Sequence, residues 1–323
     1  GHELKNKENS HVYWCPSAIY GLPISGRVWF LKFKDTVRKV GLINSFRNPC
    51  LFKLVEGKST LFLQLYVDDF IMGSTDENLL KKVELFLNEE FNVVCTDDLR
   101  KFVGIQFKFE KEKLFLHQRD MIEELRGEYR VFKNIQRPMI LNQKWTNSTK
   151  LEDVKPLQKL VGSINYISGL TRPDISYATN RIARKINDAT KEVFRSGKRI
   201  IEYLACTSDL GIEVKIWNEK RWKLVLYTDS SFADLTDEKY SSTGGYLMFL
   251  NGTPVNWKSK KLKHVCNSTA EAEYMALFIG VREAIGLGRT IEDYFGIKIW
   301  PLEVYTDNQA SLEVIKGNGS TNL

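Results

Sequence analysis

The sequence predicts an α+β protein in which antiparallel sheets alternate with helices. Short apolar runs bounded by Gly, Asn or polar residues recur in pairs, which is typical of strands joined by hairpins. Between residues 155 and 205 the apolar residues instead recur every three or four positions, which is typical of amphipathic helices. The pattern returns to strands near residue 222, and 323 residues are enough for two or three domains.

Composition excludes several classes of protein. Hydrophobic residues make up 43% and charged residues 27%, which is ordinary for a soluble globular protein. The five cysteines are odd in number and contain no closely spaced pair, so we expect a reducing compartment and neither a disulfide framework nor a zinc site. No apolar run reaches the roughly 18 residues of a membrane span, and no targeting signal is seen.

The net charge of +7 and the pI of about 9.0 lean toward a polyanionic partner. The charge is spread thinly along the chain, so a solvated Lys-rich surface explains it equally well. Residues 1–11 are short, polar and rich in Lys, Glu and Asn, and we expect a disordered tail there. The sequence does not begin with Met, so we expect a processed product or a fragment.

A helix is predicted after the Gly and Pro residues of segment 17–26. Trp29, Phe33 and Val37 recur at helical spacing, and Gly41 is a plausible stop. A strand is expected from residue 50 onward, followed by a turn that contains Gly57.

A β-hairpin with two carboxylates at its turn is predicted at Tyr66-Val67-Asp68-Asp69, between the apolar runs 61–65 and 70–72. Asp pairs are common at surface turns because Asp favours turns for local reasons. The apolar flanks favour a buried hairpin, whose two carboxylates would suit Mg²⁺, a cation that prefers oxygen ligands. Both interpretations remain open at this point.

A capping-box pattern at Ser74-Thr75-Asp76-Glu77 predicts the start of a helix with an apolar face. Two strands follow, at residues 102–109 and 114–116, joined by a charged turn. Residues 12–133 are therefore predicted as one α+β domain.

Residues 134–221 are predicted as a linker and a helical connection. The linker is residues 134–154, which are polar and irregular, and helices follow over residues 155–205, the last from about Lys191 to Leu204. Basic residues on these helices are either a track for nucleic acid or the ordinary outer face of amphipathic helices, which we favour. They are Arg181, Arg184, Lys185, Lys191, Arg195, Lys198 and Arg199.

Residues 222–323 are predicted as a domain of order βββαβα. The strands are residues 224–229, 244–250, 254–258 and 301–307, with a hairpin signal at Asn251-Gly252. A capping box at Ser268-Thr269-Ala270-Glu271 starts the first helix, and Asn308 starts the second.

Two of these strands end alike, in Tyr227-Thr228-Asp229 and Tyr305-Thr306-Asp307. If the strands are neighbours, the two Asp residues meet at their carboxyl ends, and Glu273 of the intervening helix can reach them. Glu271 is better explained as the reciprocal cap. Three converging carboxylates need cations, and they suit two-metal attack on a phosphodiester. The alternative is three unrelated surface acids.

Four parts of the chain, in the same order, resemble the polymerase polyprotein of copia-type LTR retrotransposons, including the yeast Ty group. The first is the Tyr-Gly-Leu segment that begins at Ala18 and runs through Arg27 to Trp29, and the second is the Tyr-Val-Asp-Asp hairpin. The third is residues 160–175, with Thr171-Arg172-Pro173-Asp174. The fourth consists of residues 241–246, 255–261 and 268–274, which resemble copia ribonuclease H.

The resemblance implies a reverse transcriptase palm and thumb with most of the fingers missing, a helical connection, and a C-terminally incomplete ribonuclease H domain. It implies Mg²⁺ ligands at Asp68 and Asp69 in the polymerase. In the ribonuclease H domain it implies them at Asp229, Glu273 and Asp307. Substrate contacts are implied at Tyr66, Gly21 and Arg27. The implied partners are a primer–template duplex, an RNA–DNA hybrid and dNTPs. The implied locations are a cytoplasmic virus-like particle and the nucleus.

The chain also departs from this family. Residues 1–16 contain no match to the strand of the first polymerase Asp, and Pro23 and Ile24 replace the Lys and Gln of the Tyr-Gly-Leu segment. The fourth ribonuclease H carboxylate would lie beyond Leu323. Because Mg²⁺ demands near-ideal octahedral ligation, we expect impaired or no polymerase activity. The alternatives are a non-catalytic nucleic-acid-binding remnant and a pseudogene product.

Overall fold

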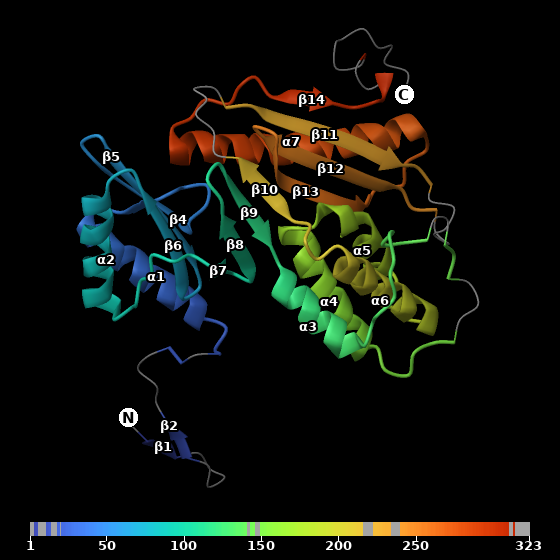
Figure 1. Cartoon of the computed structure of the whole chain (residues 1–323), viewed down its shortest axis with the longest axis horizontal. Helices are drawn as coiled ribbons and strands as arrows, with labels where there is room; N and C mark the ends of the chain where they lie inside the picture. Colours follow the sequence, from blue (N-terminus) through green and yellow to red (C-terminus); the bar gives the residue numbers. More distant parts are fainter. Residues whose placement is uncertain are drawn as a thin grey trace. The chain divides into compact units, whose positions relative to one another are not determined.

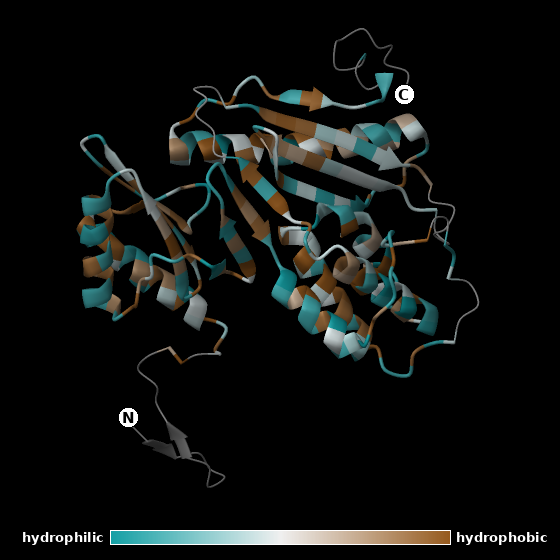
Figure 2. Ribbon diagram, in the orientation of Figure 1, coloured by the Kyte–Doolittle hydropathy of each residue, from teal (hydrophilic) through white to brown (hydrophobic). Residues whose placement is uncertain are grey.

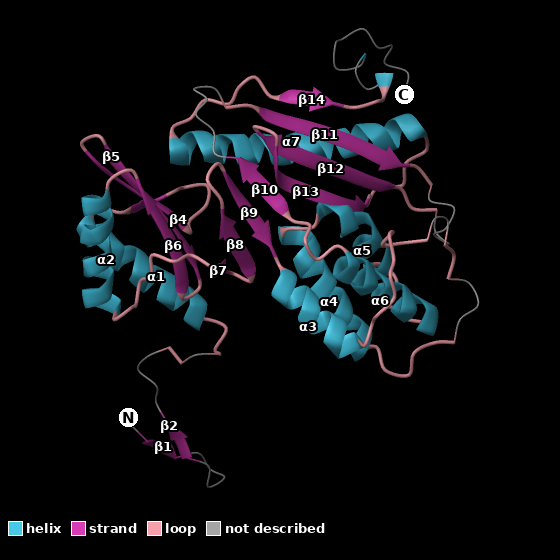
Figure 3. Cartoon of the chain, viewed as in Figure 1, coloured by secondary structure: helices cyan, strands magenta, loops and turns pink. Residues whose placement is uncertain are grey.

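The computed structural model describes residues 3–5, 11–13, 18–19, 21–140, 143–145, 149–215, 222–233, 240–309 and 313. The chain forms two compact units, residues 1–98 and 99–323. Helices and mainly antiparallel sheets occur in both units, as the sequence predicted (Figure 3). The boundary at residue 98 falls inside the predicted domain 12–133, and the predicted three-domain division stays a prediction.

The first unit is a four-stranded antiparallel sheet with two helices. The sheet order is β3-β4-β5-β6, and the elements are α1 (Ser25–Val37), η1 (Arg38–Val40), β3 (Ile43–Asn44), β4 (Leu51–Glu56), β5 (Ser59–Tyr66), β6 (Asp69–Ser74) and α2 (Glu77–Phe91). Phe33 and Val37 of α1 pack with Phe52, Leu61 and Leu63 of the sheet in one buried core. The predicted helix spacing and the stop at Gly41, which has φ +94°, are confirmed.

Two details near the ends of this unit differ from the sequence analysis. The N-cap of α2 is Asp76, whose carboxylate accepts from the backbone N–H groups of Asn78 and Leu79, and not Ser74. Asp is as good a cap as Ser, and Ser74 is held in β6. Glu3–Lys5 form β1, which pairs antiparallel with β2 (His11–Tyr13). The prediction of a disordered tail is therefore wrong for β1. The rest of segment 1–11, apart from His11, lies outside the described residues.

The second unit contains two four-stranded sheets. One has the order β10-β9-β8-β7, from β7 (Lys101–Phe102), β8 (Ile105–Phe109), β9 (Lys113–His117) and β10 (Ile212–Lys215). The predicted pairing of β8 with β9 is confirmed by Phe107 opposite Leu116. Strand β10 was not predicted, because four residues with only two apolar side chains give no periodic signal.

A helical layer fills the middle of the second unit. Its elements are α3 (Arg119–Tyr129), α4 (Lys155–Leu170), η2 (Pro173–Ile175), α5 (Ser176–Ala183) and α6 (Lys191–Cys206). Apolar residues turn inward between α3, α4 and α6, and hydrophilic residues cover the outer faces (Figure 2). The described parts of the predicted linker are irregular, but Ile135 and Trp145 are buried, so the segment packs on the helices.

Arg172 holds the joint between α4 and α5 together. Its side chain is only 1% exposed and makes a bidentate pair with Asp174, at 2.9 and 2.7 Å. It also donates to the carbonyl and hydroxyl oxygens of Thr207 and lies over the ring of Tyr203. The Thr-Arg-Pro-Asp segment thus contains a hub, the buried Arg172 side chain, that connects η2 to the end of α6.

The other sheet carries the C-terminal part of the chain. Its order is β13-β12-β11-β14, from β11 (Leu224–Ser231), β12 (Thr243–Leu250), β13 (Thr253–Lys261) and β14 (Glu303–Tyr305), with α7 (Thr269–Phe295) against it (Figure 1). The predicted turn at Asn251-Gly252 is confirmed, since both residues have positive φ. Most of the helix predicted from Asn308 lies outside the described residues. No helix in the described ranges is both long and apolar enough to cross a bilayer.

Candidate functional site

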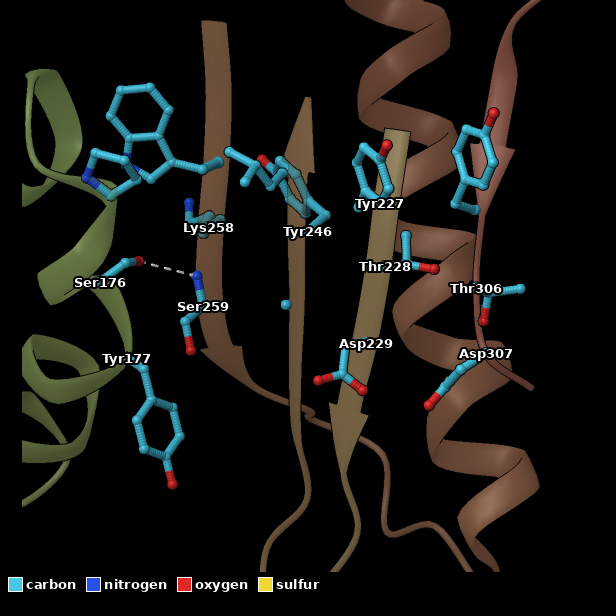
Figure 4. A pocket seen from close by; sticks show the side chains of 15 residues that line it. Ser176, Tyr177, Tyr227, Thr228, Asp229, Tyr246, Lys258, Ser259, Thr306 and Asp307 are labelled. Carbon is cyan, nitrogen blue, oxygen red and sulfur yellow. Dashed lines mark hydrogen bonds between the residues drawn. The ribbon is translucent and has the colours of Figure 1, made fainter. Parts of the chain in front are cut away.

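Three carboxylates meet at one end of the sheet that carries β11. Each of Asp229, Glu273 and Asp307 offers an oxygen that lies within 4.8 Å of the other two. Asp229 and Asp307 are exposed, whereas Glu273 is buried. Figure 4 shows Asp229 on β11 beside Asp307, which follows β14. In the described part of the chain, this is the one group of three residues able to hold a metal ion.

The two strands bring the Asp residues together because they run parallel and in register. Tyr227 pairs with Tyr305, so each Asp lies two residues farther along its strand direction. The two tyrosine rings stack at 5.0 Å on the exposed face of the sheet. Alternation along β11 places Asp229 on this same face and turns Thr228 into the interior. The expectation that the two strands are neighbours is confirmed.

Helix α7 supplies the third carboxylate from its first turns. Ser268 is the N-cap and accepts from the backbone N–H of Glu271. The Glu271 carboxylate reaches back to the N–H of Asn267, at 2.7 Å, and contacts His264. As predicted, Glu271 has a capping role and Glu273 joins the two Asp residues.

The environment of Glu273 disfavours its charged form. Burial, together with the negative charges of Asp229 and Asp307, raises the pKa of its carboxyl above the ordinary value. Ser230 opposes this shift, because its hydroxyl and its backbone N–H both donate to Oε1, at 2.7 and 3.1 Å. Oε2 is buried and has no hydrogen-bond partner among the described residues.

These features fit a hard divalent cation. The donors are all carboxylate oxygens, which Mg²⁺ prefers. Among the described residues, the buried Oε2 of Glu273 also lacks the partner that buried polar atoms normally have. A cation would also relieve the repulsion among Asp229, Glu273 and Asp307. The residues present therefore suit a divalent metal ion.

A groove of about 630 Å³ runs from the acidic residues to the start of α5 (Figure 4). Its lining includes Tyr177 of α5, Tyr227 of β11 and Trp257 of β13. Hydrogen bonds fix the helical layer to this sheet. Trp257 Nε1 donates to the carbonyl of Ser168, the N–H of Ser259 donates to Ser176, and Arg184 donates to the hydroxyl of Thr243. The groove has aromatic walls and ends at the Asp pair.

The predicted hairpin exists, and its tip is exposed rather than buried. Tyr66 pairs with Asp69, and Val67 and Asp68 form the two-residue turn. Tyr66 is 48% exposed and both Asp side chains are exposed. The two-residue turn lies beyond the last paired residues of the strands, and α1 contacts it through Trp29 without burying it. Val67 has φ +56°, which is rare for a β-branched residue and is held here by a hydrogen bond from Trp29 to its carbonyl.

A hollow of about 670 Å³ in the first unit is lined by some of the residues predicted for the polymerase site. Gly21, Trp29, Lys32 and Asp68 are among its lining residues. Arg27 is exposed in the first turn of α1, and it does not line the hollow; neither do Tyr66 and Asp69. The structure therefore brings Gly21 and Asp68 to one place.

Three residues at these sites were not identified from the sequence. Ser230 binds Glu273, and its position directly after the repeated Tyr-Thr-Asp was a usable signal. Trp29 was assigned to the core because its spacing fits the apolar face of α1, yet its indole holds the hairpin turn. Tyr177 gave no sequence signal, because its place beside the sheet depends on packing between α5 and β13.

Comparison with known proteins identifies the N-terminal part. Residues 1–139 match the family model described as reverse transcriptase (RNA-dependent DNA polymerase). Over 264 residues, or 80% of this chain, the sequence is 37% identical to the retrovirus-related Pol polyprotein from transposon RE2 of Arabidopsis thaliana. That match extends beyond residue 139 and covers 18% of the relative, so the chain spans less than a fifth of its length.

Two further relatives cover the chain similarly. The Pol polyprotein from transposon TNT 1-94 of Nicotiana tabacum is 29% identical over 98% of this chain and 24% of its own length. The putative transposon Ty5-1 protein of Saccharomyces cerevisiae is 26% identical over 84% of this chain and 89% of its own length.

Proposed function

We propose a function from the premise that this chain belongs to the Pol polyproteins of copia-type retrotransposons and carries their reverse transcriptase domain. The proposed function of its acidic cluster is hydrolysis of the RNA strand of an RNA–DNA hybrid. In this proposal residues 222–323 are a ribonuclease H-like domain, and Asp229, Glu273 and Asp307 are its metal ligands. The observation that carries the proposal is the meeting of these three carboxylates at one point.

The chain's own residues have distinct parts in this reaction. Mg²⁺ held by the three carboxylates would lower the pKa of an attacking water and neutralise charge on the phosphodiester. Asp229 and Asp307 line the open groove, and they would hold the metal ion on the side where the phosphodiester binds. Glu273 is anchored by both donors of Ser230, which fixes one of its oxygens and leaves Oε2 as a ligand.

The groove supports a nucleic-acid strand as the substrate. Tyr177, Tyr227, Trp257 and Tyr305 offer aromatic faces along it, and Lys258 offers a cation. Aromatic faces stack on sugars and bases without strong sequence preference. Such a lining suits a nucleic-acid strand of any base sequence.

The first unit is proposed to be the polymerase palm, with Asp68 and Asp69 as metal ligands. The hollow that contains Gly21, Lys32 and Asp68 is the proposed place of the incoming dNTP and the primer end. Arg27 and Tyr66 are proposed substrate contacts at its margin. The described residues place no third carboxylate with this pair, so we propose that polymerase activity is impaired in this chain.

Hybrid cleavage by the Asp229→Asn variant tests the proposal. Loss of one carboxylate ligand is expected to slow Mg²⁺-dependent cleavage of a labelled RNA–DNA hybrid by about 100-fold or more, since about 1.4 kcal/mol of transition-state stabilisation is tenfold in rate. Asp209→Asn is the matched control, because Asp209 is an exposed Asp outside the groove lining. Equal cleavage by wild type and Asp229→Asn would show that another site is responsible.

The alternative function is non-catalytic binding of nucleic acid. Among the described residues no third carboxylate lies with Asp68 and Asp69, which favours this alternative for the first unit. A chain that binds the hybrid but cleaves it no faster than Asp229→Asn would support this alternative for the whole molecule. A virus-like particle and the nucleus remain the proposed locations.

A further inference from the structure

A basic groove of about 580 Å³ lies between α6 and the segment that follows α3. Its two acidic lining residues, Glu192 and Glu202, are outnumbered by cationic ones. The cationic side chains are Arg130, Lys133, Lys191, Arg195, Lys198 and Arg199. No lining residue is shared with the groove at the acidic cluster, and α6 can be followed in Figure 1.

The charges in this basic groove are not neutralised within the described ranges. None of the six cationic side chains forms an ion pair with another described residue, although many lysines elsewhere do, such as Lys113 with Glu213. Six cations with only two acidic residues among them repel one another, and a bound anion would relieve the repulsion. The groove is therefore suited to an anionic ligand.

Two buried polar atoms at this groove also lack partners among the described residues. They are Nε of Arg199, a donor, and Oε1 of Gln143. Buried polar atoms are rarely left without a partner, and such exceptions often mark a missing ligand or water. Of the two, only the Arg199 donor suits a ligand that offers oxygen acceptors, because Gln143 Oε1 is itself an acceptor.

The walls of the basic groove are held in place without a ligand. Ser196 of α6 accepts hydrogen bonds from Gln143 Nε2 and Trp145 Nε1, at 3.1 and 3.0 Å. The N–H of Ile135 donates to the sulfur of Cys206 at the end of α6. These bonds tie both parts of the irregular segment to the helix, so the groove is preformed and a ligand need not organise it.

We propose that this basic groove binds the phosphate backbone of a nucleic acid, at a site separate from the acidic cluster. Lys191, Arg195 and Lys198 lie on successive turns, and α6 rises about 10 Å between the first and the last. One strand of a duplex presents a phosphate about every 3.4 Å along its axis, so this row of cations spans about three steps between phosphates. A nucleic-acid strand carries a negative charge at every one of these steps.

Salt-dependent binding tests the proposal. The full chain is titrated with a fluorescein-labelled RNA–DNA hybrid in EDTA, where no metal-dependent cleavage occurs, at a series of KCl concentrations. The double variant Arg195→Gln/Lys198→Gln is expected to bind about tenfold or more weakly at low salt. Its slope of log K against log[salt] is expected to fall by about 2 relative to wild type, about one per lost phosphate contact.

Matched variants separate the groove from a general loss of charge. Arg289→Gln/Lys298→Gln removes two exposed cations elsewhere in the same unit and is expected to leave the slope unchanged. Arg195→Lys/Lys198→Arg keeps the charge and is expected to retain wild-type binding, which guards against a folding defect. A groove double variant that keeps the wild-type slope overturns the proposal.

Two further measurements distinguish the ligand. Hydrogen exchange of the wild-type chain is expected to slow in residues 191–206 when the hybrid is bound, and an unchanged rate there overturns the proposal. Fluorescein-labelled poly-glutamate is the second probe. Loss of poly-glutamate binding in the groove double variant, with hybrid binding intact, would assign the groove to an acidic protein and also overturn it. These experiments measure binding and not cleavage. Their outcome therefore does not depend on whether the chain hydrolyses the hybrid.

Discussion

Glu273 is the residue on which the chemistry of the acidic cluster depends most. It is buried, its Oε2 is without a partner among the described residues, and two other carboxylates lie within 4.8 Å. Burial and those neighbours raise the pKa of its carboxyl. The charged form therefore destabilises the folded chain whenever no cation is bound.

This gives a pH-dependence with a definite sign. A carboxyl with a raised pKa in the folded state adds stability below its unfolded pKa, near 4.5, and loses that stability as pH rises through the folded pKa. In EDTA, the free energy of unfolding from urea melts is expected to decline as the pH rises above the unfolded pKa, and less so in Glu273→Gln. Glu124→Gln, an exposed change on α3, is the control. Equal pH slopes in Glu273→Gln and wild type would contradict this origin.

Arg172 is a second residue whose importance comes from burial. Burial alone would raise the pKa of Asp174, but hydrogen bonds and charge from Arg172 outweigh it and hold that pKa below its ordinary value. Arg172→Ala leaves this carboxylate partly buried and unpaired, which is expected to cost about 3 kcal/mol of unfolding free energy. Chemical denaturation measures this, with Arg289→Ala expected within about 0.5 kcal/mol of wild type. A cost as small as that control's would mean that the hub adds little stability.

The stability that Asp174 contributes has the opposite pH-dependence to that of Glu273. A carboxyl with a lowered pKa adds stability above its unfolded pKa, near 3.8, and loses it as pH falls toward the folded pKa. The acid side of the stability profile should therefore flatten in Arg172→Ala.

At the scale of elements, the contact between α7 and β11 sets the geometry of the acidic cluster. A Cβ at Gly280 would lie 2.7 Å from Cγ2 of Thr228, the residue before Asp229. The helix can approach the strand this closely only because Gly280 has no side chain. Glu273 lies two helical turns earlier on the same helix, so its distance from Asp229 depends on this approach.

Two glycines on α7 provide a matched pair of variants. Gly280→Ala forces the helix away from the sheet and is expected to lower stability by about 1 to 3 kcal/mol. Gly286→Ala has nothing within 4 Å of the new Cβ and is expected to raise stability by about 0.5 to 1 kcal/mol, because alanine favours the helix. Thermal melts measure both variants, and metal-dependent cleavage is expected to fall only in Gly280→Ala. Equal effects of the two changes would contradict the close-approach argument.

At the scale of the whole molecule, the two units differ in how many carboxylates their proposed metal sites contain. The acidic cluster of the second unit has three converging carboxylates, whereas the described part of the first unit offers only Asp68 and Asp69 at its hairpin. Mg²⁺ demands near-ideal octahedral oxygen ligation, so a polymerase site without its third proposed carboxylate is expected to hold its metal ions less tightly.

Primer extension by the whole chain is therefore expected to be weak. A labelled primer on an RNA template with Mg²⁺ and dNTPs should show little extension under conditions in which the hybrid is cleaved. Asp68→Asn measures how much of any extension uses the hairpin. Robust extension that is lost in Asp68→Asn would contradict the proposed impairment.

The sequence by itself determined most of the elements and the acidic residues of the cluster. Strand and helix periods, the cap at Ser268 and the turn at Asn251-Gly252 depend on neighbours a few residues away, so they can be recognised locally. The repeated Tyr-Thr-Asp also identified Asp229 and Asp307, because parallel neighbouring strands bring equivalent positions together. The resemblance to copia-type Pol polyproteins was confirmed by comparison with known proteins.

Only the tertiary structure decided how these parts meet. The burial of Arg172, the close approach at Gly280, the exposed hairpin tip at Tyr66 and the basic groove along α6 all involve residues far apart in the chain. Burial and unsatisfied polar atoms depend on which surfaces pack together, and local periodicity carries no such information. For this protein, the sequence named the three carboxylates, and packing of α7 on β11 brought them within reach of one cation.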